Sequence, residues 1–491
     1  GVTSVSQSAS PTSRDAHQRP VPAASSPGMI IGVMVVAAFV MILNETIVSI
    51  ALPHLATELG VTTSTVQWLI SGFLVTMAVV IPTTGFLLER FTPRQVFLVA
   101  IGSFTVGTLV AALATSFPVL LLGRMVQACG TAVMIPLVMT SVMKLIPADR
   151  RGAMMGTISI VIGVAPAIGP TVGGAILHAL GWRWMFWLVL FLAVAMFVFG
   201  LLRLYVPSET RRVPLDGASV LLSAIGFAGL VYGLSSIGQG GGVLPPWASI
   251  GIGVVGLVLF VLRQRRLQRQ DRPLLDLRTL GYARYRVALI LSLFVFMALL
   301  GAGAILLPIY LQNVLRHDTL VAGLALLPGG LMMAAVARPV GRLYDRVGAR
   351  PLVIPGAVGM TLALGLFAAL GAGAPLVAVI GVHVLLMGSL GLMMTPLMTD
   401  ALGALTDDLY SHGSALLATL QQVAGALGSA VFVTVAALGS QGPPGIPDVH
   451  GLQLAFIVAG SIGVLAIGVA LMFKRPQPAV DVEELTGSDD H

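Results

Sequence analysis

The chain has 491 residues, of which 56% are hydrophobic and only 10% are charged, and its formal net charge is +7. A soluble domain carries roughly 25% charged residues, so the composition excludes a string of ordinary soluble domains and indicates a lipid environment. The lone Cys129 excludes a disulfide-stabilised secreted scaffold.

Fourteen apolar stretches, taken in chain order, are long enough to cross a membrane. A membrane-spanning helix needs about 20 apolar residues to cross roughly 30 Å of hydrocarbon. Because the stretches are continuous and lack the alternation of barrel strands, we predict an all-α integral membrane bundle. The predicted spans are 29–53, 64–88, 95–115, 118–143, 152–178, 184–204, 216–236, 247–263, 286–312, 319–342, 350–370, 375–401, 412–439 and 450–473.

The distribution of loop cations predicts the orientation of the chain. With the amino terminus inside the cell, the outer loops carry only Arg183 and Arg316, and the other loop cations lie on the cytoplasmic side. This positive-inside imbalance places both termini in the cytoplasm. Residues 1–28 are rich in Ser, Pro and Ala and are expected to form a disordered tail, and 476–491 an acidic tail. The arginine-rich linker 263–272 has no interleaved aromatic residues, so we expect it to contact anionic lipid headgroups and no nucleic acid.

Two loop segments repeat at matching positions of the bundle. Residues 85–94 read GFLLERFTPR and close the second helix, and residues 341–350 read GRLYDRVGAR and close the tenth. We expect both loops to act as cytoplasmic gates, because a small residue one turn before an acid lets neighbouring helices approach closely. The aligned pairs are Gly85 with Gly341, Glu89 with Asp345, Arg90 with Arg346, and Arg94 with Arg350.

The spacing of this repeat predicts the domain organisation. Internal duplication is typical of secondary transporters, whose two halves rock about a site near the middle of the membrane. A bundle of six plus six helices would repeat the loop after six helices, whereas here it repeats after eight. We therefore predict a six-helix bundle over 29–204, two inserted helices with their linkers over 205–285, and a second six-helix bundle over 286–475.

Together with three helix motifs, these loops resemble the major facilitator superfamily, and within it the branch of fourteen-helix drug:proton antiporters. The resemblance extends from about residue 29 to 475. The motifs are LNETIVSIALP (43–53) in helix one, LLLGRMVQACGTA (120–132) in helix four, and GVAPAIGPTVGG (163–174) followed by GWRWMFW (181–187) around helices five and six. The helix-five residues that carry the antiporter motif are Gly163, Pro166, Gly169, Pro170, Gly173 and Gly174.

The chain departs from the pattern of this branch at a few positions. Asn44 stands where helix one usually carries an aspartate, and the neighbouring Glu45 supplies the acid. In the first gating loop Glu89 replaces an aspartate and Pro93 occupies the place of a glycine. Ala128 replaces a glycine in helix four.

Glu45 is the first candidate for a proton carrier. A carboxyl group buried in a membrane helix is costly, and burial disfavours its charged form, so it is neutral when occluded and titrates when opened to water. The alternative is that Glu45 only bonds its neighbours Asn44 and Thr46 as part of helix packing. Arg124 in helix four either forms a structural salt bridge or lowers the cost of ionising Glu45.

Two further ionisable groups lie in the twelfth helix. Asp400, near its cytoplasmic end, is expected to be a solvated loop acid like Asp407 and Asp408. His383 either titrates near neutral pH or packs as a hydrogen-bonded residue. The remaining histidines, such as His412, lie near the membrane edges without the spacing of metal ligands.

Polar and soft side chains within the spans are candidates for the substrate cavity. A buried amide must find a partner or water, and methionine adapts to ligands of different shapes. The alternative for each of them is helix packing. The candidates are Asn44, Gln127, Tyr310, Met394, Gln421 and Gln422.

The sequence carries no phosphate-binding loop, no metal cluster and no nucleophile–base set, so we predict a secondary active transporter and no enzyme. The resemblance implies an antiporter of the bacterial inner membrane that exports small hydrophobic or cationic drugs by alternating access, and we expect it to be a monomer. The proton is then the coupling ion and no cofactor is needed. Two alternatives stay open: a dedicated exporter of one endogenous metabolite, lipid or antibiotic, and a membrane protein that does not transport.

Overall fold

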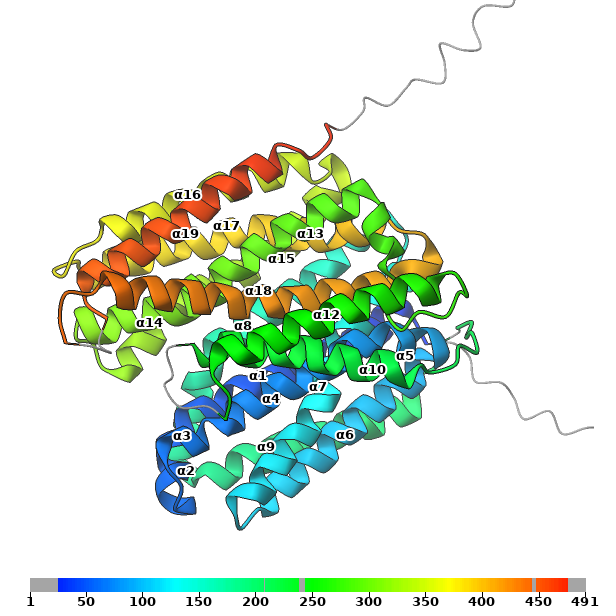
Figure 1. Ribbon diagram of the computed structural model, residues 1–491, viewed down its shortest axis with the longest axis horizontal. Coiled ribbons are helices and arrows are strands. Elements are labelled where there is room, and N and C mark those ends of the chain that lie inside the picture. Colours follow the sequence, from blue (N-terminus) through cyan, green and yellow to red (C-terminus); the bar gives the residue numbers. More distant parts are fainter. Residues whose placement is uncertain (1–24, 207, 238–242, 444–446, 476–491) are drawn as a thin grey trace, which may run out of the picture.

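The computed structural model describes residues 25–206, 208–237, 243–443 and 447–475 (Figure 1). Within these ranges the chain is helical and contains 14 helices long and apolar enough to cross a membrane. The predicted fourteen-helix fold is therefore confirmed. The predicted tails lie outside the described residues, except that the first helix already begins at Pro27.

The first six spans form one group of helices. Two of them are interrupted by a short 3-10 segment; 3-10 and π segments are labelled η throughout. They comprise α1 (Pro27–Ile47), η1 (Val48–Ala51) and α2 (Leu52–Leu59), then α3 (Thr63–Val66), then α4 (Trp68–Val80), η2 (Ile81–Thr83) and α5 (Thr84–Arg90), and then α6 (Pro93–Leu113), α7 (Phe117–Leu145), α8 (Arg151–Leu180) and α9 (Trp182–Arg203).

The inserted pair and the second group of six spans follow in the chain. The inserted helices are α10 (Gly217–Ser223), η3 (Ala224–Ala228) and α11 (Gly229–Ser236) in one span and α12 (Pro246–Gln268) in the other, and η4 (Leu277–Gly281) lies in the linker after them. The second group comprises α13 (Ala283–Phe296), η5 (Met297–Leu306), α14 (Leu307–Ile309) and η6 (Tyr310–Val314), then α15 (Thr319–Val347), α16 (Arg350–Ala369), α17 (Leu376–Gly403), η7 (Asp407–Leu409), α18 (Tyr410–Gly439) and α19 (Val449–Ala470).

Local capping explains several helix starts. Ser26 accepts a hydrogen bond from the Met29 amide at the start of α1. Thr92 and Gln95 form a capping box around Pro93, which occupies the first turn of α6. Proline is well suited to this position because its missing N–H has no partner there in any residue. The departure at Pro93 from the family pattern thus gives a well-defined helix start.

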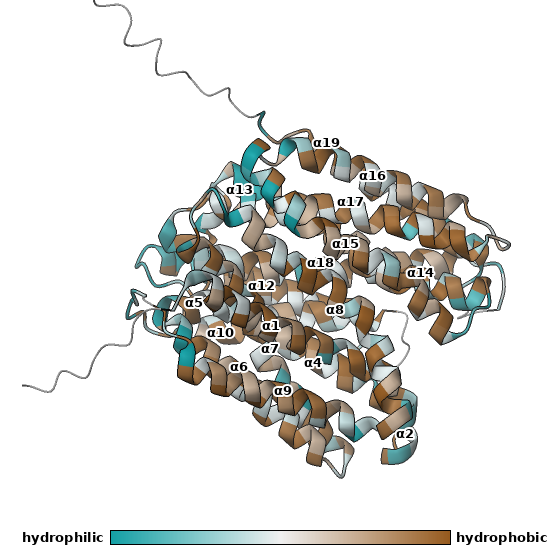
Figure 2. Ribbon diagram, turned by 180° about the vertical axis from the view of Figure 1, so that it is seen from behind, coloured by the Kyte–Doolittle hydropathy of each residue, from teal (hydrophilic) through white to brown (hydrophobic). Residues whose placement is uncertain are grey.

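The sides of the bundle are apolar and its ends are polar (Figure 2). Large hydrophobic side chains such as Phe191 and Trp247 are 74% and 77% exposed on the outer helices α9 and α12. In water such exposure would be unfavourable, whereas hydrocarbon solvates these groups. The exposed apolar surface therefore fits a chain surrounded by lipid.

The inserted helices lie against both groups of six. Helix α11 packs on α12 and also contacts α4 and α18, which belong to different groups (Figure 1). The Trp68 and Tyr232 rings stack with centroids 5.4 Å apart and join α4 to α11. The inserted pair therefore covers the seam between α4 and α18 on one side of the bundle.

Candidate functional site

A polar cluster lies between α1 and α7, with Arg124 at its centre. The Arg124 side chain is 0% exposed. Its guanidinium donates to the Leu69 carbonyl at 3.2 Å, to the Asn44 carbonyl at 3.4 Å and to Gln127 Oε1 at 3.3 Å, and it stacks over the Phe73 ring at 4.3 Å. Arginine keeps its charge in proteins, so a fixed cation lies inside this group of helices.

Asn44 and Gln127 hold the cluster together. Asn44 Nδ2 donates to Gln127 Oε1 at 3.2 Å, and Gln127 Nε2 donates to Thr108 Oγ1 at 2.8 Å. Both amide side chains are buried. The structure thus brings together Arg124, Asn44 and Gln127, three of the residues that the sequence singled out.

Glu45 lies beside this cluster on α1 and is half-buried. It interacts electrostatically with Arg124, but within the described ranges Arg124 forms no ion pair with any carboxylate. The neighbours of Glu45 on α1 have other partners: Asn44 bonds Gln127, and Thr46 bonds the Leu43 carbonyl. The alternatives stated for Arg124 and for Glu45 stay predictions.

A cavity of about 540 Å³ begins one helical turn beyond Glu45. Ser49 on η1 lines it, together with Leu52 and Pro53 at the start of α2. It lies toward the end of the bundle opposite to the one that carries both described chain ends, Ser25 and Arg475. We call the end with Ser25 and Arg475 the terminal face.

The two repeated loops make equivalent contacts at the terminal face. Asp345 at the end of α15 accepts hydrogen bonds from the amides of Gly152 at 2.8 Å and Ala153 at 3.2 Å, in the first turn of α8. Glu89 at the end of α5 contacts Nε2 of His412 at 2.6 Å, in the first turn of α18. Each acid therefore joins one half to the start of a helix in the other half, where a negative charge is favourable.

The glycines of the loops permit these contacts. A Cβ on Gly341 would lie 2.1 Å from the Gly152 carbonyl oxygen, and a Cβ on Gly85 would lie 2.7 Å from His412 Nδ1. Both distances are shorter than van der Waals contact. Glycine at these two positions is thus required for the halves to approach at the terminal face.

The last arginine of each loop caps the end of a neighbouring helix. Arg94 donates to the Gly200, Leu201 and Leu204 carbonyls at the end of α9. Arg350 donates to the Leu471 and Phe473 carbonyls at the end of α19. Cations are favourable at helix C-termini, so this pair stabilises each half. Arg90 lies over the Phe91 ring at 5.9 Å, and Arg346 is exposed.

Helix α8 lies between α1 and α15 and contacts each of them through glycines. Gly163 lies against Met333 of α15. Gly169 and Gly173 lie against Thr46 and Ile47 of α1. The helix runs without interruption through Pro166 and Pro170. The predicted small-residue motif thus serves two interfaces, one with each half of the bundle.

Further contacts between the halves lie between the terminal face and the middle of the spans. Ser159 and Thr395 hydroxyls are 2.5 Å apart, and Thr140 donates to Ser414 at 3.1 Å. Gln422 Nε2 donates to the Leu74 carbonyl at 3.1 Å. These bonds join the two groups of helices on the terminal side of the bundle.

The remaining cavity candidates make contacts inside the second half. Gln421 donates to Ser292 at 2.8 Å, and Tyr310 donates to the Gly371 carbonyl at 2.7 Å. Met394 is buried. None of these three side chains contacts the Arg124 cluster. Among the described residues, Gln422 Oε1 and His383 Nδ1 are buried without a hydrogen-bond partner.

The expectation for Asp400 is wrong. Its side chain is buried, pairs with Arg284 at 2.7 Å and accepts a hydrogen bond from Tyr344 at 2.9 Å. The partners come from α13 and α15, far away in sequence. Sequence reasoning also missed His412, although shifting the repeat by eight helices would have aligned it with the start of helix five, where Asp345 binds.

The fold and the site define a membrane transport protein. The chain belongs to the Major Facilitator Superfamily, whose family model matches residues 34–429. The resemblance seen in the sequence is thus confirmed. The chain is similar to transport proteins and not to enzymes.

Several relatives are named as drug resistance proteins. The lincomycin resistance protein LmrB of Bacillus subtilis (strain 168) is 38% identical over 457 residues, which cover 90% of this chain and 95% of that protein. A multidrug resistance protein B homolog of Mycobacterium tuberculosis is 29% identical over 405 residues, which cover 82% of this chain and 74% of that protein. The fold is shared with the human organic anion transporter MFSD10, at a TM-score of 0.64, 18% identity and coverage of 90% of this chain and 99% of that chain.

Proposed function

We propose that this protein is an antiporter that exports hydrophobic or cationic drugs across the bacterial inner membrane in exchange for protons. The observation that carries the proposal is the buried Arg124, which is held by neutral acceptors and has Glu45 as its charged neighbour. The drug class is supported by the lincomycin and multidrug resistance relatives. The terminal face is cytoplasmic in this proposal, in agreement with the distribution of loop cations.

Glu45 is the group that carries the proton. When the site is open to water, its carboxylate takes up a proton; when the site is occluded, the neutral acid avoids the cost of burying a charge. Arg124 provides a fixed positive charge that favours the carboxylate once water returns on the other side. A cationic drug near Glu45 also favours the carboxylate, so drug binding releases the proton.

Alternating access requires the terminal face to open and close. The contacts of Glu89 with His412 and of Asp345 with Gly152 close it and break in the opposite state. Inward movement of one proton provides about 2.3 kcal/mol per 100 mV and about 1.36 kcal/mol per pH unit. With one proton-carrying acid, we expect one proton per transport cycle.

Transport by purified protein in proteoliposomes with an imposed pH gradient tests the proposal. We expect Glu45→Gln to abolish gradient-driven exchange while drug binding persists. The matched control is Glu209→Gln, which neutralises an exposed linker acid and should transport like the parent protein. Undiminished gradient-driven exchange by Glu45→Gln would rule out the proposed role of this carboxyl group.

A further inference from the structure

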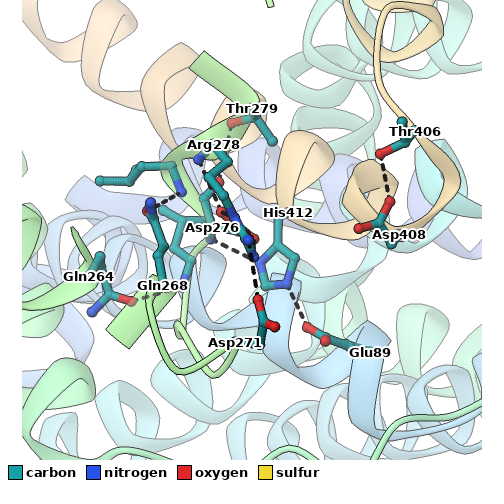
Figure 3. A network of polar contacts seen from close by, with 12 residues as sticks. Glu89, Gln264, Gln268, Asp271, Asp276, Arg278, Thr279, Thr406, Asp408 and His412 are labelled. Carbon is teal, nitrogen blue, oxygen red and sulfur yellow. Dashed lines mark hydrogen bonds and ion pairs between the residues drawn. The ribbon is translucent and has the colours of Figure 1, made fainter. Parts of the chain in front are cut away.

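His412 is the point where the inserted helices meet the closed terminal face (Figure 3). The side chain is 2% exposed. Its Nδ1 accepts a hydrogen bond from the Asp276 amide at 3.1 Å, and its Nε2 lies 2.6 Å from Glu89 Oε2. A neutral imidazole has one donor and one acceptor nitrogen. Since an amide N–H can only donate, the Asp276 amide selects the tautomer in which Nε2 donates to Glu89.

The position of the Asp276 amide is set by two glutamines of the inserted helix α12. Gln264, which is 0% exposed, accepts from the Leu274 amide at 2.7 Å and from the Leu275 amide at 3.3 Å. Gln268 accepts from the Leu277 amide at 3.1 Å. These bonds fix the linker on both sides of Asp276.

Gln264 is itself held by the first inserted span. Its Nε2 donates to Ser219 Oγ at 2.7 Å, and Ser219 belongs to α10. A buried amide with all of these partners is rigid, because leaving any of its polar atoms unpaired would be costly. The two inserted helices therefore act as one unit on the linker.

The linker that precedes the inserted helices converges on the same acid. Arg211 donates to Glu89 Oε1 at 2.8 Å, and its backbone amide donates to the Glu89 carbonyl at 3.0 Å. The Arg211 guanidinium also donates to the Asp271 carbonyl, which ties the two linkers together. At the equivalent position of the second half, Asp345 binds the start of α8 through backbone amides.

We propose that the inserted helix pair is a clamp that stabilises the closed terminal face, and that Gln264 is a positioning residue that acts through the Asp276 amide on His412. This proposal rests on the proposed function in one respect: the terminal face must open during transport. It gives the two inserted helices a role that a twelve-helix bundle lacks. Loss of the clamp shifts the protein toward the state that is open at the terminal face.

The distance between two spin labels across the terminal face measures this equilibrium. Labels at Phe91→Cys and Asp408→Cys, in a Cys129→Ala protein in lipid nanodiscs without drug or pH gradient, report the closed and open populations. We expect Gln264→Ala to raise the ratio of open to closed protein about fivefold. This is the effect of losing one buried hydrogen bond, here the bond between His412 and Glu89 across the terminal face. The control is Gln270→Ala, because Gln270 lies just after α12 but is exposed, and its side chain bonds Arg272 and no group of the clamp.

A second background separates positioning from general destabilisation. In His412→Gln the new side-chain amide can donate to Glu89 without the Asp276 amide. Adding Gln264→Ala to the His412→Gln protein should therefore have no further effect on the ratio. If Gln264→Ala does not fold, Gln268→Ala is the equivalent change on the other side of Asp276. An unchanged ratio in both glutamine variants, or an equal shift in the His412→Gln background, would overturn the clamp. Failure of the Glu45→Gln transport test would leave this result unaffected.

Discussion

Arg124, a buried cation, organises the polar residues of the first half. Its guanidinium reaches acceptors on α1, α4 and its own helix at the same time. A lysine has one ammonium group on a flexible stem and cannot keep these separate contacts. Charge alone is therefore insufficient at this position.

Replacing Arg124 by lysine tests this geometry. We expect Arg124→Lys to reduce drug export at least tenfold, although the charge is conserved, because contacts with carbonyls on two other elements are lost. Export from energised cells, normalised to the amount of protein in the membrane, is the measurement. The control is Arg183→Lys, since Arg183 donates to the Ala112 carbonyl and makes no hydrogen bond to the Arg124 cluster. Equal export by the two variants would contradict the proposed role of the Arg124 guanidinium geometry.

Asp216 at the start of the inserted pair predicts a pH dependence of stability. Hydrogen bonds from Arg263 at 2.7 and 2.9 Å hold the pKa of the Asp216 carboxyl well below its usual range. A carboxyl with a lowered pKa stabilises the fold above the pKa of the unfolded chain, and this contribution is lost as the pH falls through the lower folded pKa. The ion pair thus strengthens the clamp at neutral pH.

We expect Asp216→Asn to lower the melting temperature by about 2–4 °C at pH 7. The difference from the parent protein should stay constant above about pH 5 and shrink below about pH 4, where Asp216 of the unfolded parent chain begins to take up a proton while the folded form is still charged. Thermal unfolding of both proteins in detergent between pH 3 and 8 provides the comparison. A difference that grows toward low pH would have the wrong sign.

Much of the residue pattern could be predicted from sequence, but contacts between distant segments could not. Glu45 and Arg124 are visible because charges in apolar helices are costly. Asp400 was misplaced because its partner Arg284 is 116 residues away in the chain. His412 gave no signal by itself, since its role comes from Glu89 and from a linker amide in another part of the fold.

At the scale of the elements, α8 carries closely packed glycines toward two neighbouring helices. A Cβ on Gly169 would lie 2.0 Å from Thr46 Oγ1, whereas a Cβ on Gly174 would meet Ile50 Cδ1 at 3.4 Å, an ordinary contact. The two glycines belong to the same motif but differ in the space around them. Small residues at such crossings let helix backbones approach closely.

These two glycines form a matched pair for mutation. We expect Gly169→Ala to push α1 away from α8 and to reduce transport at least tenfold, because α1 carries Glu45. Gly174→Ala should retain transport close to that of the parent protein. Drug export is measured for both variants, and the amount of folded protein is measured by size-exclusion chromatography. Together the two measurements separate loss of activity from loss of fold. If both variants lost transport equally, the glycine content of α8 would matter and the close approach of α8 to α1 at Gly169 would not.

The elements themselves were largely predictable from apolar length. The inserted spans expected at 216–236 and 247–263 are observed at Gly217–Ser236 and Pro246–Gln268. Interruptions such as η2 in the second span and the π segment η5 were not predicted. Such local changes of helix pitch depend on packing, and apolar length contains no information about them.

At the scale of the whole molecule, the repeat shifted by eight helices connects sequence with mechanism. Each half provides one acid, Glu89 or Asp345, to the start of a helix in the other half. The two inserted helices cover the seam between α4 and α18, and Trp68 stacks on Tyr232 at the start of α4, the end of this span away from the terminal face. The closed terminal face is therefore supported differently in the two halves, directly by backbone amides in one and through His412 in the other.

Proton release on drug binding tests the central claim most directly. In weakly buffered solution near neutral pH, purified protein should release protons when a cationic drug is added, because the drug favours the charged form of Glu45. Glu45→Gln should bind the drug and release none, whereas Glu209→Gln should behave like the parent protein. Equal proton release by the parent and by Glu45→Gln would contradict the account.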